Sequence, residues 1–339
     1  MMGRAAPMNL ERLMGARCGC PFPVYDNLVA DLLAAHEPGR DGRDATVAYV
    51  LAAAAGYAYS DIETLATIMS RLGLEDNACV RVAQRVDAMF IFSTAYLVQS
   101  RCGRLVILGY RGTEPTTLGN WLADADVGSS TLALGGEVLD VHAGFYRNFR
   151  ATRWAVINEL HLALRGRSLS NPALELDHPM EALYVTGHSF GGAMAALFAL
   201  SIAGNAEQRA IAEKLRAVYT FGQPLTVGEP LPEVARAVAQ KVFRHVNARD
   251  PVPALPPLAW GRLAHFGHEF RCVNGEWKAS DKPVAQLKGL REIPGSLLAF
   301  FATAKHRKAS RYAMTEHGPH QYLAALRPNG RVTEFGDRG

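Results

Sequence analysis

Apolar and polar positions follow two different spacings along the chain, and the change of spacing predicts where helices give way to strands. Residues 26–73 are typical of helices: an apolar, alanine-rich run at 49–55 is followed by Ser60-Asp61, a typical N-cap, and by a segment that ends at Gly73. Beyond these helices the apolar runs become short and rich in β-forming residues, at 89–98 and 105–110. The pattern predicts a helical N-terminal segment and then a β-hairpin.

Strands and helices alternate after this hairpin. Helices are expected at 143–165, 191–203 and 232–240, and strands at 182–186, 217–221 and 241–246. Such alternation is typical of a largely parallel sheet with helices on its faces. The tetrad at 273–276, with Asn274-Gly275 at its centre, predicts a further hairpin, and residues 284–326 are expected to be helical again. The expected fold class is therefore α/β.

The length of 339 residues suits one catalytic domain with additional elements better than two equal domains. We expect an N-terminal helical extension packed on the core over residues 1–85. The catalytic domain is expected over 86–330, with a helical insertion at about 281–311, and a C-terminal tail over 331–339.

Charge and cysteine usage narrow the function classes. The formal net charge is +4, the charges are interspersed, and basic clusters are short, so no nucleic-acid partner is expected. Five cysteines are an odd and sparse set, which argues against a disulfide framework. The first twenty residues lack an apolar leader core, and no apolar run is long enough to span a membrane. We expect a cytoplasmic protein, with secretion by a non-classical route as the alternative.

The segment Gly187-His188-Ser189-Phe190-Gly191 carries the strongest chemical signal. It is a Gly-x-Ser-x-Gly motif with an apolar strand before it and an alanine-rich helix after it. In that context the motif predicts a strained strand-to-helix turn that exposes a nucleophilic serine above the sheet. The alternative, a chance match in a loop, is disfavoured by the flanking elements. We expect Ser189 to be the nucleophile.

A serine nucleophile needs a base, and the base needs a carboxylate to orient it. Asp250 follows a β-rich run and precedes a proline, the place expected for the acid, although Asp-Pro alone is also ordinary turn chemistry. His317 precedes Gly318-Pro319 at the predicted start of a helix and is the expected base. His320, inside that helix, is the reserve.

An oxyanion hole requires two donors. The first is expected from the backbone N–H of Phe190, the residue after the nucleophile. The second is expected from the segment after the strand at 105–108, where Thr113 can donate from its N–H and its hydroxyl. Taken alone, this segment is also compatible with an ordinary strand-ending turn.

Several spaced motifs together resemble the class 3 lipase family, the fungal-lipase-like branch of the α/β-hydrolases. They occur in the family's order over residues 105–326. The matching segments are Arg111-Gly112-Thr113, Asn120-Trp121-Leu122-Ala123-Asp124, His142-Ala143-Gly144-Phe145, residues 187–192, Phe221-Gly222-Gln223-Pro224, Asp250-Pro251-Val252-Pro253 and residues 317–323.

The resemblance implies an α/β-hydrolase fold, a triad of Ser189, Asp250 and His317, and Thr113 as the side-chain oxyanion donor. In the family the aspartate of the Asn-Trp-x-x-Asp segment, here Asp124, helps to position that donor, with Asp126 as a nearby alternative. His188, beside the nucleophile, is expected to support the site. After Phe-Gly-x-Pro the chain departs from the family, because residues 225–228 do not follow the usual Arg-Val-Gly.

The expected activity is hydrolysis of a carboxylic ester, as in lipases and esterases, through an acyl-enzyme and without a metal or organic cofactor. The expected partner is an ester or lipid substrate, with transient contact to a lipid interface. Residues 114–136 and 293–308 are the candidate lids. Two alternatives use the same scaffold: an acyltransferase that passes the acyl group to an alcohol, and a non-catalytic protein that binds a lipid or a partner.

Overall fold

The computed structural model describes residues 9–15, 17, 22–37, 42–113, 128–288 and 313–337. A nine-stranded sheet runs through the centre in the order β1-β2-β3-β4-β7-β8-β9-β10-β11. The strands are β1 (Asn9–Met14), β2 (Ala78–Val86), β3 (Ile91–Gln99), β4 (Leu105–Tyr110), β7 (Ala182–His188), β8 (Leu215–Phe221), β9 (Val242–Asn247), β10 (His268–Val273) and β11 (Glu276–Ser280). A separate two-stranded sheet consists of β5 (Ser129–Leu134) and β6 (Glu137–His142).

In the central sheet, β4, β7, β8, β9 and β10 are parallel to one another, whereas β1, β2, β3 and β11 are antiparallel to their neighbours. Because β4, β7, β8 and β9 run in the same direction, their carboxyl ends meet at one edge of the sheet. In open α/β sheets this edge is where ligands bind. The expected α/β-hydrolase fold, with a mostly parallel central sheet, is confirmed.

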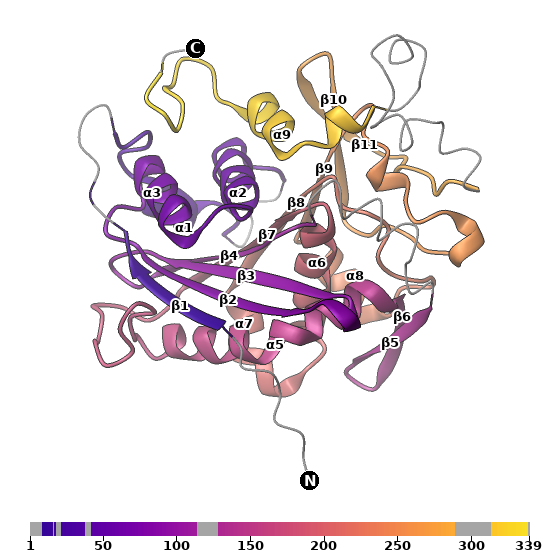
Figure 1. Ribbon diagram of the computed structural model, residues 1–339, viewed down its shortest axis with the longest axis horizontal. Helices are drawn as coiled ribbons and strands as arrows, with labels where there is room; N and C mark the ends of the chain where they lie inside the picture. The colour runs from indigo at the N-terminus through magenta and orange to yellow at the C-terminus, as the bar shows by residue number, and fades with distance from the viewer. Residues whose placement is uncertain are drawn as a thin grey trace.

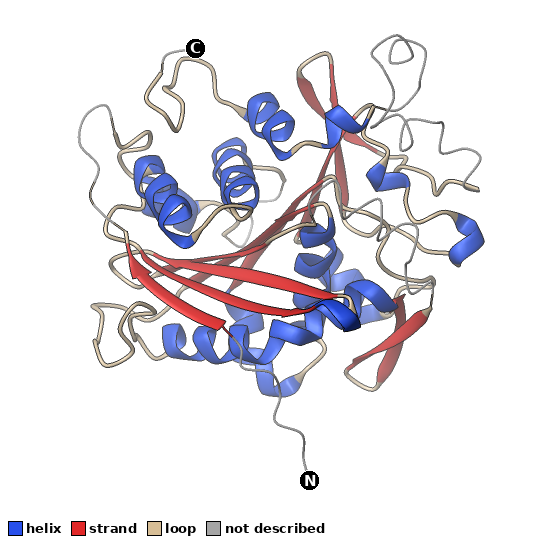
Figure 2. Ribbon diagram, in the orientation of Figure 1, coloured by secondary structure: helices blue, strands red, loops and turns tan. Residues whose placement is uncertain are grey.

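Helices cover both faces of the sheet (Figures 1 and 2). One face carries α1 (Leu28–Ala34), α2 (Ala45–Tyr57), α3 (Ile62–Leu72) and α9 (Pro319–Leu326). The other face carries α5 (Ala143–Leu164), α6 (Phe190–Ala203), α7 (Arg209–Lys214) and α8 (Glu233–Ala239). The chain therefore forms three layers, with the sheet in the middle.

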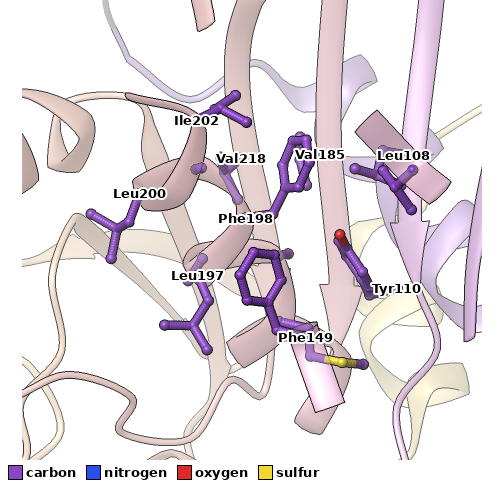
Figure 3. Close-up of a cluster of buried hydrophobic side chains, with 14 of the residues drawn as sticks. Leu108, Tyr110, Phe149, Val185, Leu197, Phe198, Leu200, Ile202 and Val218 are labelled. Carbon is purple, nitrogen blue, oxygen red and sulfur yellow. The ribbon is translucent and has the colours of Figure 1, made fainter. Parts of the chain in front are cut away.

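Successive side chains of a strand point to opposite faces of the sheet, so the sheet divides the hydrophobic core into two parts. On β4, Ile107 packs with the layer of α1, α2 and α3, whereas Leu108 packs with the layer of α5 and α6. Helix α6 is apolar on every side, as expected of a helix that is fully enclosed. Its side chain Phe198 lies beside Val185 of β7 (Figure 3). The start of α6 is thereby held rigidly below the carboxyl edge of the sheet.

The N-terminal segment contains the expected helices. The N-cap predicted at Ser60-Asp61 is Asp61, whose carboxylate accepts a hydrogen bond of 2.7 Å from the N–H of Thr64, and Gly73 ends α3 with φ +130°. The segment 1–85 is nevertheless not only helical, since β1 and most of β2 belong to the central sheet. Val80, Val82 and Val86 alternate with Arg81 and Arg85 along β2, but the polar Gln84 falls among the apolar positions and interrupts the period of two.

The expected helical stretch at 284–326 is only partly found among the described residues. Residues 284–288 form no helix, and helical structure there comprises a 3₁₀ turn at Met314–His317 and α9. Residues 289–312, and with them most of the expected insertion at 281–311, lie outside the described residues.

Candidate active site

Ser189 lies between β7 and α6 in a backbone conformation that residues other than glycine rarely adopt. Its φ is 58° and its ψ is −127°, and its N–H donates to the carbonyl of Phe221 at 2.8 Å. The flanking glycines are required sterically, because a Cβ on Gly187 would overlap the Gly191 carbonyl and a Cβ on Gly191 would overlap the carbonyl of Tyr110. Such local strain persists only where the surrounding structure enforces it.

Ser189, His317 and Asp250 form one hydrogen-bonded row. The Ser189 hydroxyl lies 2.8 Å from His317 Nε2, and His317 Nδ1 lies 2.8 Å from Asp250 Oδ2. Ser189 is the N-cap of α6, His317 ends the 3₁₀ turn before α9, and Asp250 follows β9. All three side chains are buried, so water competes little for these hydrogen bonds. The row can pass a proton from the serine to the imidazole.

Two further donors fix the Asp250 carboxylate. Tyr322 donates its hydroxyl to Oδ2 at 2.6 Å, and the N–H of Val252 donates to Oδ1 at 2.8 Å. Burial raises the pKa of the Tyr322 phenol well above its usual value, and the adjacent carboxylate raises it further. The hydroxyl therefore stays protonated and remains a donor to Asp250.

His188 ties the nucleophile turn to the segment that carries His317. Its Nε2 lies 2.6 Å from the carbonyl oxygen of His317, and its Nδ1 lies 2.9 Å from the hydroxyl of Tyr59. Burial lowers the pKa of His188 well below its usual value, and the proximity of His317 lowers it further. The neutral ring then donates from Nε2 to His317 and accepts at Nδ1 from Tyr59, which fixes its tautomer.

The segment after β4 packs directly on the nucleophile turn. A Cβ on Gly112 would overlap the Tyr59 hydroxyl and lie 2.5 Å from the carbonyl oxygen of His188. Thr113 follows immediately, partly exposed, at the carboxyl edge. Phe190 begins α6, where the helix N-terminus favours negative charge. The two expected oxyanion donors thus belong to segments in backbone contact.

The remaining expected site residues fall elsewhere. His320, the reserve base, is exposed and lies 3.2 Å from the side-chain amide nitrogen of Gln321 rather than near Ser189. Asp124 and Asp126 lie outside the described residues, as do residues 293–308 and most of the other candidate lid at 114–136. Within the described ranges, no group of three or more His, Cys, Asp or Glu side chains is placed to hold a metal ion.

Gly222 offers a test of how closely the site is packed. Its φ is +61°, and an added Cβ would lie 2.7 Å from Asp250 Oδ2 and 2.9 Å from His317 Nδ1. Gly222→Ala is expected to lower kcat by at least about tenfold, because an error near 1 Å in a reacting group costs about this much or more. The measurement is kcat on a soluble ester together with Tm.

Gly275→Ala is the matched control for Gly222→Ala. Gly275 has a φ of +82° in the turn between β10 and β11, and a Cβ added there would meet no described atom within 4 Å. The substitution introduces backbone strain without a clash at the site, so Tm is expected to fall and kcat to stay unchanged. Equal kcat losses in the two variants would contradict the steric argument.

Tyr59 and Tyr322 are functional candidates that sequence reasoning did not single out. Tyr322 lies in a segment that carries the family resemblance, but no local signal gives it a role, and Tyr59 lies in the N-terminal segment, far from every motif. No sequence signal marks Tyr59, because its contact with His188 joins positions 129 residues apart.

Tyr59→Phe is expected to lower stability and kcat together while leaving KM nearly unchanged. The loss of the hydroxyl leaves Nδ1 of His188 without a partner in a buried place, at a cost of about 1–3 kcal/mol. Denaturant unfolding and kinetics on a soluble ester measure the two effects. Tyr57→Phe, on the same segment but directed to Glu334, is the control and is expected to change stability alone. An unchanged kcat in Tyr59→Phe would show that His188 does not need this partner.

The family model that matches this chain is that of a lipase family, and similar curated proteins are named as lipases. The family model described as "Lipase (class 3)" matches residues 107–260. The chain is 28% identical over 248 residues to "Triacylglycerol lipase OBL1" of Arabidopsis thaliana, covering 64% of this chain and 46% of that protein. It is 27% identical over 184 residues to "Secreted mono- and diacylglycerol lipase A" of Penicillium cyclopium, covering 54% of this chain and 53% of that protein. The chain thus spans about half the length of these curated relatives.

Solved structures show the same fold. The lipase of Rhizomucor miehei in its propeptide complex superposes with a TM-score of 0.53 at 19% identity, over 80% of this chain and 78% of that chain. The match at this low identity concerns the arrangement of the sheet and helices.

The expectation of a cytoplasmic protein is wrong. The Penicillium cyclopium relative is named as a secreted enzyme, which contradicts that placement. The expectation depended on residues near the first position and on an odd number of cysteines, and neither determines the compartment of a protein. In the part of the chain that the structure describes, no helix combines the length and the apolar character needed to cross a membrane.

Proposed function

We propose that this chain, whose residues 107–260 match the model of the class 3 lipase family, hydrolyses carboxylic esters of lipids with Ser189 as the nucleophile. The observation that carries the proposal is the row Ser189–His317–Asp250, in which both hydrogen-bonded distances are 2.8 Å. The relatives named as lipases support the lipid substrate class.

In the proposed first step, His317 Nε2 removes the proton of the Ser189 hydroxyl while the oxygen attacks the ester carbonyl carbon. Asp250 holds the proton on Nδ1 and stabilises the imidazolium that forms. The negative charge that develops on the carbonyl oxygen is stabilised by the N–H of Phe190 and by Thr113. Each such donor contributes about 10²–10³ in rate.

Collapse of this intermediate releases the alcohol, which takes its proton from His317. Ser189 then carries the acyl group as an ester. A water molecule gives a proton to His317 and attacks the acyl carbon, and the acid leaves as the serine recovers its proton. His188 and Tyr59 act only as positioning residues, because they hold the backbone carbonyl of His317 and the turn before Ser189.

A panel of p-nitrophenyl esters with acyl chains from about two to sixteen carbons tests the proposal, since an apolar pocket distinguishes ligands by size. Hydrolysis that depends on Ser189 and rises toward long chains supports a lipase. An optimum at short chains narrows the proposal to an esterase with a confined pocket. The absence of any hydrolysis that depends on Ser189 would contradict the proposed function.

A further inference from the structure

The β2–β3 hairpin ends in an exposed apolar tip. Met89 is 56% exposed and Phe90 is 53% exposed, and both belong to the connection between Val86 and Ile91. Phe90 has a φ of +51°, in the left-handed region that a bulky aromatic residue rarely adopts. An exposed aromatic side chain in a strained conformation contributes nothing to the core, so its position calls for another explanation.

Helix α5 holds the backbone of this tip in place. The buried side chain of Asn148 donates from Nδ2 to the carbonyl of Phe90 at 3.0 Å and accepts at Oδ1 from the N–H of Phe92 at 2.7 Å. Arg147 Nη1 also donates to the carbonyl of Met89 at 3.4 Å. These hydrogen bonds therefore fix the backbone conformation of the tip.

The tip projects from the edge of the sheet that carries Ser189. Ala95 pairs with Tyr110 at the end of β4, and Tyr110 pairs with Gly187 just before the nucleophile turn. Phe90 lies five residues beyond Ala95, which at about 3.3 Å per residue reaches well past this edge. The same helix α5 contacts the site, since the rings of Phe145 and Phe190 lie 5.0 Å apart.

A cavity of about 350 Å³ lies beside the tip and is lined by residues of the hairpin, β5 and α5. Arg147 and Arg150 line it, together with polar Gln84 and Ser130. Arg85 is paired with the exposed Asp87 at 2.8 Å, so the acidic group on the tip is already neutralised. Arg147 and Arg150 thus line a cavity that lies next to an exposed apolar pair.

We propose that this tip face, formed by Met89, Phe90, Arg147 and Arg150, docks on the surface of an anionic lipid aggregate. Met89 and Phe90 enter the acyl region, and the two arginines bind lipid phosphates in the cavity. Apolar insertion combined with basic residues is the combination that binds proteins to anionic lipid surfaces. The proposal depends on the proposed lipid substrate for its purpose, but its test does not require turnover.

Phe90→Asn separates this role from a structural one. Asparagine tolerates the left-handed conformation, so Tm is expected to stay constant or to rise. In a Ser189→Ala background, which prevents turnover, binding to phosphatidylcholine vesicles that contain about one third phosphatidylglycerol is expected to weaken at least about tenfold. Phe335→Asn, an aromatic residue 60% exposed in the C-terminal tail, is the matched control and is expected to bind like the parent.

The double variant Arg147→Gln/Arg150→Gln tests whether the charges of the two arginines contribute to binding of the anionic vesicles. The pair is expected to lose on the order of tenfold in binding to the anionic vesicles, and added salt is expected to weaken the parent more than this variant. Arg101→Gln/Arg209→Gln removes two exposed arginines elsewhere and is the control. Equal binding of the parent to vesicles of phosphatidylcholine alone would overturn the preference for anionic lipid.

Unchanged vesicle binding by Phe90→Asn would overturn the docking surface itself. A change in the oligomeric state of this variant, without a change in vesicle binding, would assign the tip to a contact with a second copy and would also overturn it. Hydrolysis of a short soluble ester, measured in the Ser189 protein, is expected to be the same with Phe90 or Asn at this position. Absence of that hydrolysis in the parent would count against the proposed function and leave the vesicle result to be judged separately.

Discussion

Ser189→Ala is expected to lower kcat for ester hydrolysis by about 10⁶-fold, because removal of the nucleophile disables the whole triad. The residual rate comes from the oxyanion donors and from substrate binding. The folded structure is expected to persist, since the Ser189 side chain makes its hydrogen bond only with His317 among the contacts described. The measurement is kcat on a soluble ester, with Tm as the check on folding.

Ser201→Ala is the matched control for this substitution. Ser201 lies on α6, twelve positions after Ser189, and is also buried. It is expected to keep both kcat and Tm close to those of the parent. A Ser189→Ala enzyme with more than a small fraction of the parent activity would show that another group carries the chemistry.

Asp250→Asn is expected to lower kcat by about 10⁴-fold near neutral pH. The carboxylate accepts from the Val252 N–H at Oδ1 and from His317 and Tyr322 at Oδ2, whereas an amide has only one acceptor oxygen. With that oxygen on the Val252 N–H, the amide NH₂ faces His317 Nδ1 and favours the wrong tautomer. KM is expected to change little, because Asp250 is buried behind His317. Steady-state kinetics on one soluble ester gives both constants.

Tyr322→Phe distinguishes orientation of the imidazole from general disturbance of the site. This variant removes one donor to Asp250 and leaves the carboxylate, so the loss in kcat is expected to be far smaller than that of Asp250→Asn. Similar losses in the two variants would contradict the role given to Asp250.

The nucleophile turn could be predicted because local sequence determines it. The strand, the two glycines around Ser189 and the following apolar helix are contiguous, and each is required by sterics that act within a few residues. Asp250 and His317 are also marked locally, by a proline and by Gly318-Pro319. The choice between His317 and His320 needed the structure, because it depends on which ring points over the sheet.

The parts of the site and the fold that escaped prediction depend on distant contacts. Tyr59 reaches His188 from the N-terminal helical segment, and no spacing in the sequence joins them. Strand β1 pairs with β2 across more than sixty residues, so its short and partly polar sequence gave no signal of its own. The strained backbone of Phe90 could not be predicted either, since no sequence pattern indicates a positive φ at an aromatic residue.

Mass spectrometry after treatment with a fluorophosphonate probe tests the central claim most directly, because the probe reacts with an activated serine. We predict one adduct per chain, located on Ser189, with none in Ser189→Ala and slow formation in Asp250→Asn. An adduct on a different residue, or no adduct on the folded parent protein, would contradict the assignment of Ser189 as a nucleophile activated by His317 and Asp250.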